Sequence, residues 1–224
     1  MSTDGAFSST CVVLFSGGRD STLAAIRLAR LFERIVLVTV KSPYMTGLRN
    51  LQSRLEELKR VLAVQCEWML VPEKRLLPYQ VSGKDLGCIG CHFSYFASAY
   101  SIARQLGSDS IACGFVEYQN SWVEQTPYSV ARLRDLMSQY RIKLLLPVAD
   151  LRSKAEVQTE LATYGVTQDS LELKCSKQET DPGLAESPLK AIVDQGIEAL
   201  RVVLDNDQRS EHPLQTVVVS GCGK

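Results

Sequence analysis

The sequence predicts an α/β fold in which a parallel sheet has helices on both faces. Apolar, β-prone runs alternate with helical patterns five times along the chain, the order expected when crossover helices join parallel strands. The run from Arg34 to Val40 is apolar almost throughout, which is typical of a strand covered on both sides. A glycine-rich turn also separates the first strand from the first helix, as in many nucleotide-binding sheets.

Each element follows from a local pattern. Short apolar runs predict strands at residues 11–15, 34–40, 66–71, 110–115 and 142–147. Helical composition and spacing predict helices at residues 23–32, 48–62, 93–106, 128–140, 153–164 and 188–204. Ser153 is the expected N-cap of its helix, and Gly107 and Gly165 follow helix ends as C-terminal glycines do.

Length and composition limit the class of protein. A chain of 224 residues is long enough for one α/β domain, so residues 1–204 are expected to form a single domain and residues 205–224 a C-terminal tail. Lys and Arg together number 25, as do Asp and Glu, so the formal net charge is zero. This balance argues against a large, generally basic nucleic-acid surface, although it leaves room for a local patch.

The sequence contains no apolar run of the roughly 18 residues that span a membrane. Its first ten residues are polar and lack the pattern of a signal peptide, so a cytoplasmic location without membrane attachment is expected. In that compartment, seven cysteines point to metal binding, redox chemistry or buried packing before disulfides.

The stretch from Ser16 to Thr22 carries the strongest functional pattern. It lies between a strand and a helix, where free N–H groups and the positive end of the helix dipole attract anions. Its glycines leave room for a ligand close to the backbone, and its hydroxyls add donors. The residues expected to bind the cofactor are Ser16, Gly17, Gly18, Arg19, Asp20, Ser21 and Thr22.

Five of these residues (Ser16, Gly17, Gly18, Asp20 and Ser21) resemble the SGGxDS motif of the PP-loop ATP pyrophosphatases. The resemblance implies a doubly wound fold and a loop that grips the pyrophosphate of ATP with Mg²⁺. It also implies transfer of AMP to a substrate oxygen, with Asp20 acting through the metal or orienting the loop. The competing interpretation is an ordinary glycine turn.

A second segment, "IKLLLPVADLRSKAEV" at residues 142–157, resembles the later motif of the same family. Lys154 corresponds to the family lysine that reaches the phosphates, so the resemblance assigns catalysis to Asp20, Ser21 and Lys154. The alternative for Lys154 is a solvated surface lysine. Val40 and Lys41 end the second strand and are therefore candidates to line the adenine pocket, because ligands sit beyond the carboxyl ends of strands.

The cysteines divide into two groups. Cys11, Cys66 and Cys113 lie in expected strands and are interpreted as small buried hydrophobic residues. Cys88 and Cys91 have CxxC spacing, which suits metal binding or a redox pair, and haem attachment is rejected because no export signal is seen. The predicted metal ligands are Cys88, Cys91, Cys175 and Cys222, holding zinc or an iron–sulfur cluster; Cys222 is also open to interpretation as an incidental tail cysteine.

Two branches of the family fit different features. The succession "GFVEYQNSW", "LPVADLRSKAEV", "YGV" and "LELKC" resembles 7-cyano-7-deazaguanine synthases of queuosine biosynthesis, which replace a substrate oxygen with nitrogen and bind zinc. The mid-chain CxxC with a later lone cysteine resembles instead the tRNA thiolation branch, in which cysteines hold an iron–sulfur cluster or carry sulfur. The expected partners are therefore ATP and either a small nucleobase-like substrate or tRNA, and homodimer formation stays open.

Other residues give weaker indications. Glu117, Tyr118, Asn120 and Trp122 follow the fourth strand and suit either a nucleobase pocket or an ordinary polar loop. The only histidines are His92 and His212, which disfavours acid–base catalysis by histidine. A non-catalytic nucleotide-binding regulator is the third alternative, and the intact Asp20, Ser21 and Lys154 argue against it.

Overall fold

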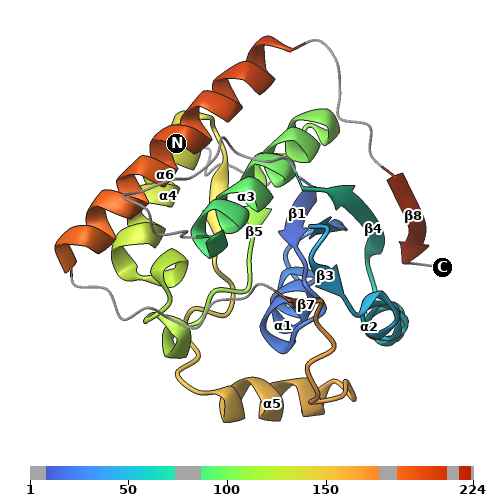
Figure 1. Cartoon of the computed structure of the whole chain (residues 1–224). Coiled ribbons are helices and arrows are strands. Elements are labelled where there is room, and N and C mark those ends of the chain that lie inside the picture. The colour runs from blue at the N-terminus through green and yellow to red at the C-terminus, as the bar shows by residue number, and fades with distance from the viewer. Residues whose placement is uncertain (1–8, 74–86, 177–185, 211–216, 223–224) are drawn as a thin grey trace, which may run out of the picture.

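The computed structural model describes residues 9–73, 87–176, 186–210 and 217–222. Its main sheet has six strands in the order β6-β5-β1-β2-β4-β8 (Figure 1). The first five strands of this order pair in parallel, which confirms the predicted sheet. Their bounds are β1 Thr10–Leu14, β2 Arg34–Lys41, β4 Gln65–Pro72, β5 Ser110–Ala112 and β6 Lys143–Leu145.

Six α-helices flank the sheet in the described part of the chain. They are α1 Arg19–Leu28, α2 Leu48–Val61, α3 Gly87–Leu106, α4 Pro127–Gln139, α5 Lys154–Thr163 and α6 Glu186–Arg209. Two short 3₁₀ turns, η1 Glu117–Gln119 and η2 Val123–Gln125, lie between β5 and α4. None of the described helices is both long enough and apolar enough to cross a membrane.

The sheet separates two hydrophobic cores. Val12 packs with the inner faces of α3, α4 and α6, whereas its neighbours Cys11 and Val13 pack with α1, α2 and α5. This alternation follows from the pleat, because successive side chains of a strand point to opposite faces. Helices therefore cover both sides, and the doubly wound architecture is confirmed. Cys11, Cys66 and Cys113 are buried in these cores, as expected.

The strand order reverses between β1 and β5. β2 and β4 lie on one side of β1, and the later strands β5 and β6 lie on the other. In an open α/β sheet, ligands bind beyond the carboxyl ends of the strands at such a reversal. The Ser16–Thr22 stretch directly follows β1, so the topology places it at this position.

The C-terminal region differs from the expected tail. α6 continues to Arg209, so the predicted boundary after residue 204 falls inside this helix. Strand β8 (Val217–Cys222) then pairs antiparallel with β4. The apolar run at residues 217–219 is thus part of the sheet, where it pairs with backbone groups of β4 that would otherwise form an open edge.

Two helices begin earlier than predicted. α1 begins at Arg19 instead of Leu23 and ends at Leu28, so four residues of the glycine-rich stretch form its first turn. α3 begins at Gly87, which places the CxxC pair within the helix rather than ahead of it. A small second sheet, β3 (Met45–Thr46) with β7 (Lys174–Cys175), was not predicted because two-residue strands are too short to show a period.

Candidate functional site

The phosphate loop (residues 16–22) is ordered by its own hydroxyl groups. Gly18 precedes α1 with an extended backbone. Its carbonyl oxygen accepts hydrogen bonds from the hydroxyls of Ser21 at 3.2 Å and Thr22 at 2.6 Å. The Gly18 N–H donates to the Ser16 hydroxyl at 3.2 Å, and the hydroxyls of Ser16 and Ser21 lie 3.1 Å apart. These bonds fix the turn while the first N–H groups of α1 lack partners within the helix, which is the arrangement that attracts anions.

Gly17 is required by both conformation and space. Its φ is +79°, in the left-handed region that favours glycine. A Cβ atom there would stand 2.5 Å from Cδ1 of Leu51 on α2 and 3.0 Å from the carbonyl oxygen of Leu171. The loop is therefore packed between α2 and a segment from much later in the chain.

Gly114 brings the loop after β5 against the start of α1. A Cβ atom on Gly114 would stand 2.6 Å from the backbone nitrogen of Ser21. Any larger residue would push β5 and α1 apart at the position where the strand order reverses. The contact between Gly114 and Ser21 thus fixes the distance between the loop after β5 and the start of α1, the two sides of the expected ligand crevice.

Asp20 is held from the other side of the crevice. The Tyr118 hydroxyl donates to its Oδ1 at 2.7 Å, and the Gln119 side chain donates to its Oδ2 at 3.4 Å. Burial raises the pKa of Asp20; Glu172 adds to this effect, and Tyr118 and Arg19 oppose it. The carboxyl is therefore oriented by η1, and the Tyr118 hydroxyl contacts the phosphate loop.

Arg54 on α2 is a fully buried arginine that the amphipathic pattern of its helix did not single out. Its guanidinium donates to the carbonyl oxygens of Thr167 at 3.0 Å and Asp169 at 2.5 Å, and more weakly to that of Gly17 at 3.4 Å. Glu57 supplies the opposite charge at 2.6 Å. Burial lowers the pKa of Arg54, and Glu57 raises it, so the ion pair offsets the cost of burying the charge.

The covering segment (residues 167–175) runs over the phosphate loop. The Leu173 N–H donates to the carbonyl oxygen of Ser16 at 3.2 Å. Glu172 Oε2 lies 3.0 Å from the position of a Cβ on Gly18, so a carboxylate stands beside the start of α1. The segment ends in β7, whose Cys175 pairs with Met45 of β3.

Three predicted metal ligands lie in one neighbourhood. Cys88 and Cys91 stand one turn apart on α3, and both are half-buried, as is Cys175. Burial raises the pKa of the Cys91 thiol, its hydrogen bond with Glu73 adds to this, and Cys88 and Cys175 contribute through charge. Cys88 and Cys175 thus lie near enough to Cys91 to interact with it electrostatically, and Glu73, which directly follows β4, hydrogen-bonds to it.

The thiols that the structure describes do not by themselves form a complete metal site. Among the described residues, no three side chains of Cys, His, Asp or Glu converge closely enough to hold a metal ion. The backbone of Cys222 pairs with Cys66 in the sheet, and its side chain lies outside the described residues, as does His212. Zinc or iron–sulfur binding by this set therefore stays a prediction.

Lys154 is exposed at the first position of α5. The predicted cap is confirmed, because Ser153 Oγ accepts a hydrogen bond from the Glu156 N–H at 3.2 Å. The segment before α5 contacts the turn that holds Asp20. The Glu117 N–H donates to the Leu151 carbonyl at 3.2 Å, and Glu117 lies one residue before Tyr118. The start of α5 is therefore connected to the residues that hold Asp20.

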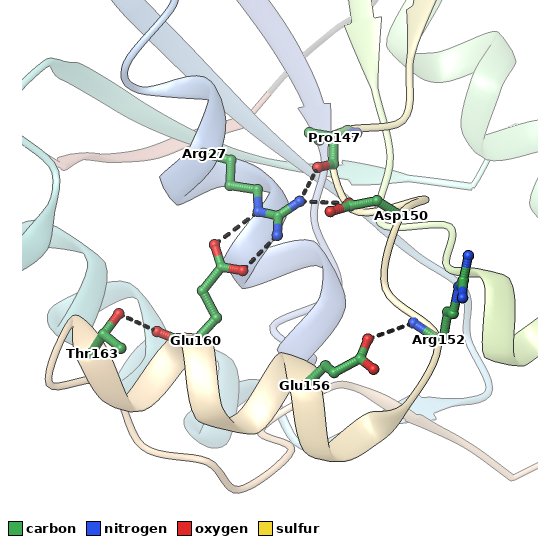
Figure 2. A network of polar contacts seen from close by, with 7 residues as sticks. All are labelled: Arg27, Pro147, Asp150, Arg152, Glu156, Glu160 and Thr163. Atoms are coloured by element: carbon green, nitrogen blue, oxygen red, sulfur yellow. Dashed lines mark hydrogen bonds and ion pairs between the residues drawn. The ribbon is translucent and has the colours of Figure 1, made fainter.

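Arg27 of α1 forms hydrogen bonds and an ion pair with Glu160 of α5 (Figure 2). Its guanidinium donates to the carboxylate of Glu160 at 2.8 and 2.5 Å, to Asp150 Oδ1 at 2.6 Å and to the carbonyl of Pro147 at 2.8 Å. A paired contact between guanidinium and carboxylate is among the stronger polar interactions of proteins. Arg27 therefore fixes both α5 and the loop after β6 against the helix that begins at the phosphate loop.

The remaining predicted residues lie around the same edge of the sheet. Val40 is buried in the core beneath α3, whereas Lys41 is exposed at the end of β2. Glu117 and Asn120 are exposed and Trp122 is half-buried. Their roles in binding adenine or a base stay predictions.

Four residues that contribute to the site were not singled out from the sequence: Arg54, Glu73, Gly114 and Glu172, although Gly114 opens "GFVEYQNSW" and Glu172 lies within "LELKC". Arg54 offered a signal, because it falls on the apolar face of its helix between Leu51 and Leu55, where a charge needs buried partners. The other three are revealed only by the packing of segments that are distant in sequence.

No protein-family model matches this sequence, and no curated protein matches it. Solved structures do share its fold. A 4-thiouridine synthetase in complex with RNA and bound ATP matches with a TM-score of 0.66 and 17% identity, over 94% of this chain and 55% of that one. The U34-tRNA thiolase NcsA from Methanococcus maripaludis, with its [4Fe-4S] cluster, matches with a TM-score of 0.53 and 14% identity, over 89% of this chain and 70% of that one.

The chain spans about half the length of the 4-thiouridine synthetase. At these identities the comparisons concern architecture alone. The strand order, the loop after β1 and the shared fold together show that the chain has the doubly wound architecture of PP-loop proteins.

Proposed function

We propose that this chain binds ATP at the phosphate loop, transfers AMP to an oxygen of a nucleobase and replaces that oxygen with sulfur. The observation that carries the proposal is the course of the covering segment. It lies on the phosphate loop at Leu173 and, two residues later, brings Cys175 toward Cys88 and Cys91. A group that activates an oxygen and groups that handle sulfur would thus share one edge of the sheet.

Two solved structures that share the fold support this choice. One is described as a 4-thiouridine synthetase with bound ATP and RNA, and the other as a U34-tRNA thiolase. Both descriptions concern thiolation of RNA, and a tRNA base is accordingly the acceptor that we propose.

The first step is displacement at the α-phosphorus. The substrate oxygen attacks, a P–O bond forms, and the bond to the pyrophosphate oxygen breaks. The N–H groups at the start of α1, the Ser21 hydroxyl and Lys154 would stabilise the charge that develops on the pyrophosphate. The carboxylates of Asp20, within the loop, and of Glu172, beside Gly18, are of the type that suits Mg²⁺, which would neutralise phosphate charge.

In the second step a sulfur nucleophile attacks the activated carbon. A C–S bond forms, and the C–O bond breaks as AMP leaves with the original oxygen. With hydrosulfide as the nucleophile, the atoms and electrons of this step balance. Cys88, Cys91 and Cys175 are the residues that we propose bind the sulfur donor. Hydrosulfide supplies the transferred sulfur atom, so the step involves no change of oxidation state and needs no oxidant or reductant.

Replacement of the oxygen by nitrogen is the second candidate. The order of "LPVADLRSKAEV", "YGV" and "LELKC" favours it, because this succession resembles the 7-cyano-7-deazaguanine synthases. Ammonia would attack in place of hydrosulfide, and Lys154 and the phosphate loop would act as before. A nucleotide-binding regulator would bind ATP and release no pyrophosphate.

The test offers one enzyme preparation two sets of substrates. Unmodified tRNA with sulfide and 7-carboxy-7-deazaguanine with ammonium are each incubated with Mg·ATP, and products are identified by mass spectrometry. Thiolated tRNA, lost in Cys91→Ser and Cys175→Ser but retained in the buried control Cys113→Ala, supports the proposal. Formation of a nitrile from 7-carboxy-7-deazaguanine would contradict the proposal and support replacement of the oxygen by nitrogen, the second candidate.

A further inference from the structure

A buried arginine joins the phosphate loop to the segment that carries Cys175. Arg54 lies on α2 and has no exposed surface, and its guanidinium hydrogen-bonds to both the phosphate loop and the covering segment. Three of its acceptors are backbone carbonyls rather than side chains: those of Gly17, Thr167 and Asp169. Gly17 belongs to the phosphate loop, and the other two begin the covering segment.

Burying a charged side chain is costly unless every donor finds a partner. Glu57 balances the charge of Arg54 at 2.6 Å, which leaves the remaining donors to fix backbone positions. A lysine carries the same charge but cannot direct donors to three separate carbonyls, because it lacks the planar fork. The site thus depends on the shape of arginine as well as on its charge.

Contacts beyond Arg54 extend the connection in both directions. Leu51, one turn before it on α2, packs against Gly17, and Leu171 approaches the same glycine. Leu173 then donates to the Ser16 carbonyl, and β7 follows immediately with Cys175. Asp169, whose carbonyl Arg54 binds, therefore lies six residues before Cys175 in the chain, and Leu173 between them is itself bonded to the phosphate loop.

We infer that Arg54 is a positioning residue that holds the covering segment on the phosphate loop and so sets the position of Cys175 relative to bound nucleotide. The part of this inference that concerns bound nucleotide and sulfur transfer rests on the proposed function. Its structural content, the joint placement of two segments, stands on the hydrogen bonds alone.

The test compares Arg54→Lys and Arg54→Met with Arg60→Met, an exposed arginine on the same helix. Hydrogen exchange is followed at the Leu173 amide, which the Ser16 carbonyl protects, and at the β1 amides as an internal reference. We expect Leu173 to exchange about tenfold faster in Arg54→Lys, with β1 unchanged and Arg60→Met like the parent. Unchanged protection of Leu173 in Arg54→Lys would overturn the inference.

A second readout separates positioning from general destabilisation. In Arg54→Lys we expect ATP-dependent pyrophosphate release to persist while product formed per pyrophosphate falls about tenfold, because activation is uncoupled from transfer. A parallel fall of both quantities would show a merely structural role. If the parent protein forms no product with any acceptor, the proposed function fails, and the exchange measurement still decides the role of Arg54.

Discussion

The Tyr118 hydroxyl donates to Oδ1 of Asp20 at 2.7 Å, joining the turn after β5 to the first turn of α1. These two segments lie on opposite sides of the point where the strand order reverses. The contact therefore crosses the crevice expected to hold the ligand. It fixes the one carboxylate of the phosphate loop in a partly buried position where ionisation is disfavoured.

We predict that Asp20→Asn stabilises the protein at pH 7 while it abolishes turnover. Burial raises the pKa of Asp20 in the folded state above its ordinary value of 3.8. The folded state therefore loses stability as the pH rises from 3.8 through this raised pKa. Asparagine carries no such penalty and can still accept from Tyr118. Thermal melts at pH 7 should show a higher Tm, with the difference shrinking below pH 3.8.

The same variant should release pyrophosphate at least about a hundredfold more slowly than the parent. A Tm that is unchanged or lower at pH 7 would contradict the assigned burial of Asp20. Normal turnover in both Asp20→Asn and Ser21→Ala would contradict the role of the loop.

Two glycines offer a matched comparison for the phosphate loop. Gly17 and Gly165 both have positive φ, at 79° and 68°, but only Gly17 has neighbouring atoms where a Cβ would stand. Alanine at Gly165 should cost about 1 kcal/mol of stability because of the left-handed backbone, and alanine at Gly17 should cost more because of the added clash. Only Gly17→Ala should also raise the Kd for ATP, by about tenfold or more, since Leu51 and Leu171 must shift. Calorimetric titration that finds equal ATP affinity in the two variants would contradict this.

Cys91 should react slowly with iodoacetamide at neutral pH. Burial and the neighbouring Glu73 raise the pKa of its thiol, and only the thiolate is alkylated. Glu73→Gln removes a hydrogen-bonding negative charge, so the pKa should fall and alkylation should accelerate. Mass spectrometry of the α3 peptide measures the rate, with the exposed Glu33→Gln as control. Equal rates in both variants would place Glu73 away from the thiol.

Arg27→Met should lower the free energy of unfolding by about 1–3 kcal/mol, because Glu160 is left half-buried without its partner. Arg30→Met is the control two residues beyond the end of α1: Arg30 is exposed and lies 5.6 Å from the centre of the Tyr164 ring, a contact worth less than about 1 kcal/mol. Urea denaturation compares the two midpoints. Equal midpoints would mean that α5 does not depend on Arg27 for its attachment.

The sequence predicted those features that depend on local patterns. Continuous apolar runs identified the parallel strands, and spacing identified α2 almost to the residue. The predicted start of α1 was wrong by four residues because Ser21 and Thr22 were assigned to the turn, whereas both lie in the helix and their hydroxyls donate to the carbonyl of its N-cap, Gly18. Hydroxyl residues at such a boundary suit both states, and the hydrogen-bond partner decides between them.

The candidate site was predicted in part for a similar reason. The phosphate loop and the paired cysteines of α3 each form a contiguous motif, so their residues could be identified before their positions were known. Arg54 bonds mainly to backbone carbonyls, and Gly114 contacts backbone atoms of Ser21. Contacts of this kind leave no sequence pattern at the partner, because any residue supplies the same carbonyl or N–H.

The most direct test is to identify which bond of ATP is broken. Mg·ATP is incubated with the protein, unmodified tRNA and sulfide, and phosphorus NMR identifies the nucleotide and phosphate products. The proposed chemistry predicts AMP and pyrophosphate, with both lost in Ser21→Ala and strongly reduced in Lys154→Met. Formation of ADP and orthophosphate, or release of pyrophosphate that does not depend on Ser21, would contradict AMP transfer at the phosphate loop.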